Sequence, residues 1–197
     1  MNMNDIDFDS SWLVCDAKHL EQMKRDLVAE ETSNPDDPDL LAIVTPENRL
    51  FVFEDGENRA TLFNYEKERR FLSSAREVLF CTAEKRGHYS DIALYKDGSC
   101  QWALWHDGLD DPRHLDETGE PAGNYAMIKK TLLRMQDELG DNPEGIDHLY
   151  ALPLLLARDL YGYGADTALP QGAIYKWDTK PRPSGIARFF KRLMGRD

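Results

Sequence analysis

LLAIVTPENRLFVFE, residues 40–54, contains two short apolar runs joined by polar residues. The first run, Leu40 to Thr45, is followed by Pro46-Glu47-Asn48, a combination typical of a turn. The second run, Arg49 to Glu54, has the length and the β-branched and aromatic content of a strand. Because Leu50-Phe51-Val52-Phe53 is apolar at consecutive positions, both faces of this strand are expected to be buried. The stretch therefore predicts neighbouring strands in a sheet that is covered on both sides.

The same kind of pattern recurs later in the chain. Val78-Leu79-Phe80-Cys81 is again apolar at consecutive positions, and Lys96-Asp97-Gly98 provides a tight turn. The strands expected in this region are Glu77 to Ala83, Asp91 to Tyr95 and Ser99 to His106. Two more strands are expected, near 59–63 after an Asp-Gly turn, and over 173–177 at an edge of the sheet.

Helices are expected over four segments, mostly because apolar residues are spaced three and four apart. These segments are 16–30, 65–74, 125–139 and 149–160. The predicted fold class is therefore α+β, with a mostly antiparallel sheet of about six strands packed with helices in a single domain, residues 1–179. Residues 180–197 are expected to form a Pro-rich linker and a short basic amphipathic helix over 186–194.

The charge of the chain is its strongest compositional feature. It contains 36 Asp and Glu against 24 Lys and Arg, for a net charge of −12. Residues 1–60 hold 15 acidic and 5 basic groups, and residues 101–150 hold 11 and 4. A field of this sign repels nucleic acid and speeds encounter with a basic protein, although solubility alone is the alternative explanation. We therefore expect a protein partner and no nucleic acid.

The sequence also predicts a cellular compartment. It has no apolar run of the ~20 residues that a membrane span requires. Residues 1–11 lack the basic start and apolar stretch of a secretory signal. Cys15, Cys81 and Cys100 form no C-x-x-C pair and lie among apolar residues, which favours reduced, buried side chains. We predict a cytoplasmic protein without disulfides.

The densest polar group is His106-Asp107-Gly108-Leu109-Asp110-Asp111-Pro112-Arg113-His114. Its imidazoles and carboxylates are of the types that hold divalent metals, so one alternative is a metal-dependent hydrolase. Gly, Asp and Pro are equally the residues of a solvated turn, and we expect a loop without metal. Because the chain contains no nucleotide-binding, phosphate-binding or serine-hydrolase motif, we expect neither a cofactor nor catalysis.

Two acidic loops are candidate binding sites for a basic partner. The first carries Asp36, Asp37 and Asp39, and the second carries Asp107, Asp110 and Asp111. The sequence does not show which of them lies beside an interface anchor, and we favour the second.

Trp105, just before the second loop, is the candidate anchor. Strand alternation over Ser99 to His106 places Cys100, Trp102 and Leu104 on one face, and Gln101, Ala103 and Trp105 on the other. If the first face packs on the core, Trp105 lies in a polar rim, where tryptophan commonly anchors protein interfaces. The alternative is that a helix covers Trp105.

Several short stretches between residues 99 and 166 together carry a resemblance to known proteins. They are Trp105-His106-Asp107, His114-Leu115, Gly119-Glu120-Pro121, Ile146-Asp147-His148-Leu149-Tyr150-Ala151-Leu152-Pro153 and Leu160-Tyr161-Gly162. With the size and acidity of the chain, they resemble small acidic bacterial immunity proteins of polymorphic toxin systems. The resemblance implies an inhibitor that binds a basic toxin domain without catalysis. A third possibility is an adaptor tethered by the basic C-terminal helix.

Overall fold

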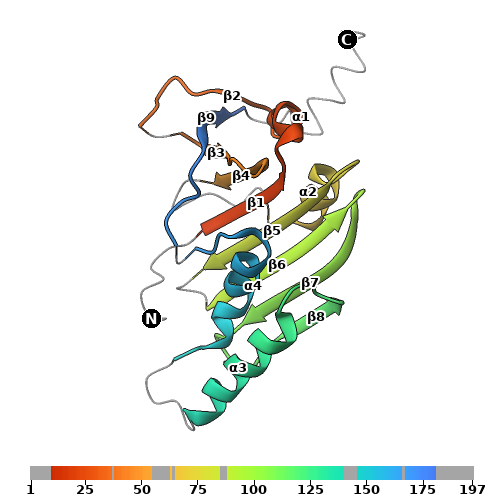
Figure 1. Ribbon diagram of the computed structural model, residues 1–197, viewed down its shortest axis with the longest axis vertical. Helices are drawn as coiled ribbons and strands as arrows, with labels where there is room; N and C mark the ends of the chain where they lie inside the picture. The colour runs from red at the N-terminus through yellow and green to blue at the C-terminus, as the bar shows by residue number, and fades with distance from the viewer. Residues whose placement is uncertain are drawn as a thin grey trace.

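The computed structural model describes residues 10–36, 38–54, 63, 65–84, 88–139, 146–165 and 167–180. These residues form a nine-stranded sheet in which each neighbouring pair of strands is antiparallel. The strand order is β2-β9-β3-β4-β1-β5-β6-β7-β8 (Figure 1). The predicted α+β class, with a mostly antiparallel sheet in a single domain, is confirmed.

The strands are β1 (Ser10–Asp16), β2 (Ala29–Glu31), β3 (Leu40–Val44), β4 (Arg49–Glu54), β5 (Glu77–Glu84), β6 (Tyr89–Lys96), β7 (Ser99–Asp107), β8 (Asp116–Gly119) and β9 (Ala173–Thr179). The α-helices are α1 (Leu20–Asp26), α2 (Glu66–Leu72), α3 (Tyr125–Glu138) and α4 (Leu152–Tyr161). Short 3-10 helices, η2 (Ala17–His19) and η3 (Leu149–Ala151), precede α1 and α4.

The central strands fill two cores, one on each face of the sheet. On β1, Trp12 and Val14 belong to the core shared with α3 and α4, whereas Leu13 and Cys15 belong to the core shared with α1 and α2. Because successive side chains of a strand point to opposite faces, burial of both faces requires apolar residues at consecutive positions. The prediction of a sheet covered on both sides is therefore confirmed at its centre.

Helices α3 and α4 cover one face of the β5–β8 half of the sheet (Figure 1). Helix α4 contacts β5, β6 and α3, which explains why most of its residues are apolar and buried. It ends at Gly162, whose left-handed φ of +81° favours glycine. The opposite face of β6, β7 and β8 is left without these helices.

The N-terminal region differs from the sequence prediction. The helix expected over 16–30 ends earlier, because Val28 adopts a left-handed φ of +56° and Ala29 begins β2. Asp16 accepts a hydrogen bond from the Lys18 N–H at 2.9 Å, as expected for an N-cap. The apolar stretch before it is the central strand β1. Strand β1 and the short polar strands β2 and β8 were not predicted, and they raise the strand count from about six to nine.

Two details of the sheet were also predicted wrongly. Strand β9 is not an edge strand, because the three-residue β2 pairs with it on its outer side. A bulge between Leu94 and Tyr95 shifts the β6–β7 register, so that Tyr95 pairs with Cys100 and Leu94 with Trp102. Cys100 therefore packs on the α1–α2 side, and only Trp102 and Leu104 share the other core.

Three predicted features lie outside the described residues. They are residues 59–62 of an expected strand, the acidic residue Asp37, and the linker and basic helix over 181–197.

The three free cysteines should differ in reactivity towards a thiol reagent. Cys81 is fully buried, and burial raises its pKa well above the usual value; burial likewise raises the pKa of Cys15 to about 12. Burial raises the pKa of Cys100 as well, but this side chain is only half-buried and therefore accessible to the reagent. At pH 8 the native protein should be alkylated almost only at Cys100. Mass spectrometry after timed iodoacetamide treatment measures this, with urea-unfolded protein as the control. Labelling of Cys81 at the unfolded rate would contradict the prediction.

Candidate protein-binding site

Trp105 lies near the end of β7 with 42% of its surface exposed. The flanking strand residues Leu104 and His106 point to the opposite face and are buried. Strand alternation thus places Trp105 on the face away from α3 and α4, and its exposure shows that no described helix encloses it. A large exposed aromatic side chain on a sheet face is a typical anchor for another protein.

Two aromatic rings flank Trp105. The ring centroids of Tyr89 and His114 lie 6.4 Å and 5.2 Å from that of the indole. His114 Nδ1 accepts a hydrogen bond from the Asp107 N–H at 2.9 Å, and the Tyr89 hydroxyl donates to Asp91 Oδ2 at 2.7 Å. Both flanking rings are therefore fixed, which restricts the indole before any partner arrives.

A buried ion pair lies beside Trp105 in the sheet. Asp91 is directly opposite Trp105 in the β6–β7 register, and Arg69 Nη2 on α2 donates to both of its carboxylate oxygens at 2.8 Å. The two side chains are 8% and 7% exposed. Burial, reinforced by the Asp91 charge, raises the pKa of Tyr89, so that its hydroxyl stays a donor to Asp91. The base of the site is a fully bonded polar network.

Behind Trp105, His106 joins segments that are far apart in sequence. Its Nδ1 lies 2.6 Å from the His114 carbonyl oxygen, and its Nε2 lies 2.7 Å from Asp147 Oδ2. Asp147 Oδ1 accepts the Tyr150 N–H at 3.1 Å. The His106 and Asp147 side chains are 0% and 5% exposed. Both ring nitrogens therefore lie within hydrogen-bond distance of an oxygen, and the imidazole joins the loop after β7 to the segment before η3.

Gly108 allows this close packing. A Cβ atom at this position would lie 2.0 Å from Asp147 Oδ2 and 2.7 Å from His106 Nε2. His88, which is 43% exposed, places its Nδ1 3.7 Å from the same carboxylate oxygen. The imidazoles of this junction contact a carboxylate, a carbonyl and a backbone N–H, and they hold the loop after β7 in place.

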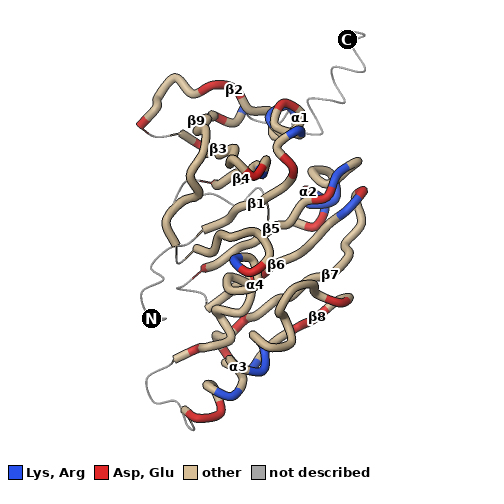
Figure 2. The backbone as a smooth tube through the Cα atoms, in the orientation of Figure 1, with Lys and Arg blue, Asp and Glu red and all other residues tan. Residues whose placement is uncertain are grey.

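The second acidic loop follows Trp105 directly in the chain. Asp116, at the start of β8, lies opposite Trp105 in the β7–β8 register, whereas Arg113 of the loop pairs with Asp137 of α3 at 2.7 Å. Residues 105–120 contain six Asp or Glu and one Arg, a net charge of −5 without histidine. Acidic positions along β8 and the basic positions of the neighbouring α3 are visible in Figure 2. Leu109, 69% exposed, adds an apolar side chain. We define the Trp105 surface as the following residues: Trp105, Asp107, Leu109, Asp110, Asp111 and Asp116.

Short turns fix the backbone of this loop. Asp107 Oδ1 accepts the Leu109 N–H at 3.3 Å, and Asp111 Oδ1 accepts the Arg113 N–H at 2.8 Å. Asp110 and Asp111 are exposed, and Asp107 is half-buried. The carboxylates are thus presented on an ordered loop.

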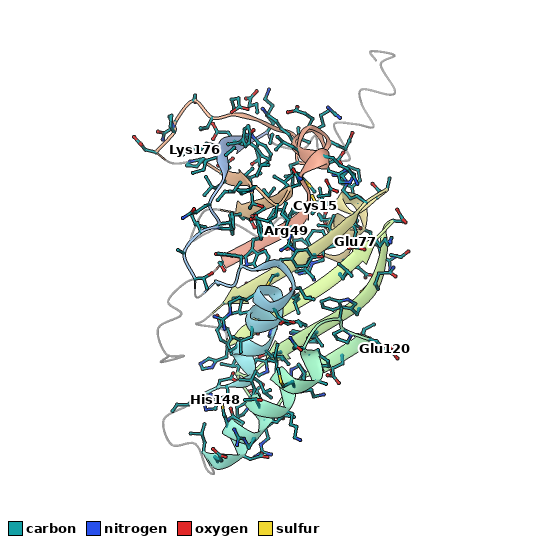
Figure 3. All side chains as sticks on the ribbon, in the orientation of Figure 1. Cys15, Arg49, Glu77, Glu120, His148 and Lys176 are labelled. Atoms are coloured by element: carbon teal, nitrogen blue, oxygen red, sulfur yellow. The ribbon has the colours of Figure 1, made fainter. Side chains whose placement is uncertain are left out.

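The first acidic loop lies at the other end of the sheet. Asp36 is exposed between β2 and β3, whereas Asp39 Oδ2 accepts hydrogen bonds from the N–H and hydroxyl of Thr179, both at 2.8 Å. The labels of Lys176 on β9 and Glu120 after β8 mark these opposite ends in Figure 3. With strands about 4.8 Å apart, the two acidic loops are separated by on the order of 30 Å. They do not form one patch.

The metal alternative has little geometric support. The ring nitrogens of His106 are both bonded within the protein, and His114 Nδ1 is occupied by a backbone N–H. Across the part of the chain that the structure describes, no three His, Cys, Asp or Glu side chains converge as a metal-ligand group.

Sequence reasoning missed most partners in this site. Asp147 lies 41 residues from His106, and Asp91 lies 22 residues from Arg69. Asp147 lies just before η3, and nothing in its local sequence links it to His106, so only the tertiary structure reveals this contact. A signal did exist for Asp91, which begins the predicted strand Asp91 to Tyr95, and Tyr89 precedes it by two positions, on the same face once the strand is extended to β6.

No protein-family model, no curated protein and no solved structure matches the chain. Within the described residues, none of the helices is both long and apolar enough to cross a bilayer.

Proposed function

We propose that the protein is an immunity-type inhibitor, which binds a basic toxin domain through the Trp105 surface and performs no catalysis. The observation that carries this proposal is the exposed indole of Trp105, which contacts the rings of Tyr89 and His114, lies opposite Asp116 in the sheet and directly precedes the acidic loop. The combination matches the usual anatomy of a protein interface, in which an aromatic anchor is enclosed by a polar rim.

The geometry favours tight binding for two reasons. An anchor that is held in place before binding loses little conformational freedom when the complex forms. The acidic loop attracts a basic partner over a distance of about one Debye length, roughly 8–10 Å at physiological salt, and so speeds encounter.

Neutralising the acidic loop should slow association. The triple change Asp107→Asn, Asp110→Asn and Asp111→Asn keeps side-chain size and the turn hydrogen bonds of this loop but removes three charges. We expect association to slow about tenfold at low salt and to become less sensitive to salt, because long-range steering is lost. Stopped-flow binding to the product of the reading frame adjacent to this gene, at two salt concentrations, measures both effects.

A matched control separates local charge from net charge. The control variant changes three exposed acidic residues on the β2–β4 half of the molecule: Glu21→Gln, Asp36→Asn and Glu47→Gln. It removes the same number of negative charges as the loop variant. The association rate of this control should change by less than twofold to threefold, roughly, because the charges lie far from the anchor. If both triple variants slow association equally, the acidity acts globally. If the neighbouring product does not bind at all, the inhibitor proposal fails.

A further inference from the structure

We propose that an extended basic segment of the partner adds to the sheet as a strand beside β8. This inference rests on the proposed function and specifies how the partner is recognised. It assigns the partner an extended conformation and an alternating sequence.

The first observation is the edge of the sheet, where no strand of the described residues pairs with the outer side of β8. Strand β8 is the last in the strand order, and its residues Asp116–Gly119 are all exposed. Alternate backbone N–H and C=O groups of such an edge strand point away from the sheet, ready to pair with another extended chain. This edge borders the Trp105 surface, because Asp116 lies opposite Trp105 in the β7–β8 register.

The two faces of β8 differ in chemistry. Asp116 and Thr118 lie on the same face as Trp105 and Ala103, whereas Glu117 lies on the α3 face opposite Leu104. Lys129 of α3 donates to Glu117 Oε1 at 2.7 Å. An added strand would therefore place every second side chain over the acidic Trp105 surface and the others towards α3.

The α3 side selects apolar side chains. Lys129 also lines a groove along α3, and the other lining residues are Tyr125, Ala126, Lys130, Thr131, Leu133, Arg134 and Asp137. The carboxylate of the groove, Asp137, is already paired with Arg113 at 2.7 Å. Basic side chains there would meet Lys130 and Arg134, whereas apolar side chains would pack on Tyr125 and Leu133. The complementary segment thus alternates basic and apolar residues.

Charge also argues against a second copy of this chain as the occupant. Antiparallel pairing of two β8 strands would bring Asp116 and Glu117 of one copy near those of the other. Like charges across a strand pair are destabilising. At the opposite edge, the acidic side chains of β2 are already paired, Glu30 with Lys180 and Glu31 with Lys24.

The test uses a ten-residue peptide of alternating Lys and Val with the full-length protein. We expect the peptide to bind and to slow amide hydrogen exchange in residues 116–119 at least about tenfold, because strand addition pairs the edge groups. A Glu-Val peptide of the same length should not bind. Asp116→Lys should weaken binding about tenfold through reversed cross-strand charge, and Asp36→Lys at the other end should leave it unchanged.

Backbone pairing is tested separately from charge. Two further Lys-Val peptides carry N-methyl groups either at every Lys or at every Val, which removes alternate N–H donors. At least one of them should bind at least about tenfold more weakly, because each lost hydrogen bond contributes about 1 kcal/mol. If both bind like the parent peptide, or if the parent peptide does not bind, strand addition is overturned. The inhibitor proposal is overturned only if the neighbouring gene product fails to bind, so the two failures are distinguishable.

Discussion

Replacing Asp147 by alanine should lower the free energy of unfolding by about 3 kcal/mol, because it leaves the buried His106 ring without its partner. His106 is completely inaccessible, and its Nε2 has Asp147 Oδ2 at 2.7 Å as its acceptor. The substitution also removes the acceptor for the N–H of Tyr150 in η3. Urea denaturation at pH 7, followed by tryptophan fluorescence and circular dichroism, measures the change.

Two further variants identify the cause. Asp147→Asn keeps an acceptor for the Tyr150 N–H and a polar group beside His106 Nε2, so it should lose less than half as much stability. Asp159→Ala removes a carboxylate that also accepts two hydrogen bonds, from the backbone and side chain of Asn124, but at the surface. The loss of unfolding free energy for Asp159→Ala should be clearly smaller than for Asp147→Ala. Equal losses of unfolding free energy for Asp147→Ala and Asp159→Ala would show that the buried His106–Asp147 pair adds no more stability than an exposed carboxylate does.

Replacing Trp105 by alanine should increase the dissociation rate of the partner complex about 30-fold, equivalent to about 2 kcal/mol, typical of an interface anchor. The association rate should change little, since the indole carries no charge. The variant should remain folded, because Trp105 is 42% exposed and lies outside both cores. Surface plasmon resonance with the neighbouring gene product measures the two rates separately.

The control for this variant is an exposed apolar residue elsewhere. Ile174 on β9 is 60% exposed and lies near the far end of the sheet, so Ile174→Ala should leave both rates unchanged. Trp105→Phe should fall between the wild type and alanine, because it retains an aromatic ring between Tyr89 and His114. A dissociation rate that is the same for Trp105→Ala and Ile174→Ala would remove Trp105 from the interface.

The central strands could be predicted because their information is local. Leu50 to Phe53 and Val78 to Cys81 are apolar at consecutive positions, and burial on both faces of the sheet requires that pattern. The strands β2 and β8 could not be predicted, because each is short and polar and exists only by pairing with a longer neighbour. The same holds for the bulge that moves Cys100 to the other face.

The candidate site likewise contains features that the local sequence predicts and features that depend on the tertiary structure. Alternation in β7 and the composition of the following loop place an indole next to acidic residues without any tertiary information. The sequence therefore determined a two-sided sheet and an acidic loop beside Trp105. The strand order decided that the Asp36 loop lies at the opposite end and that β8 is the last of the described strands. The packing of η3 and α4 on the sheet, not strand pairing, brings Asp147 to His106. These arrangements join residues far apart in the chain, so no local pattern encodes them.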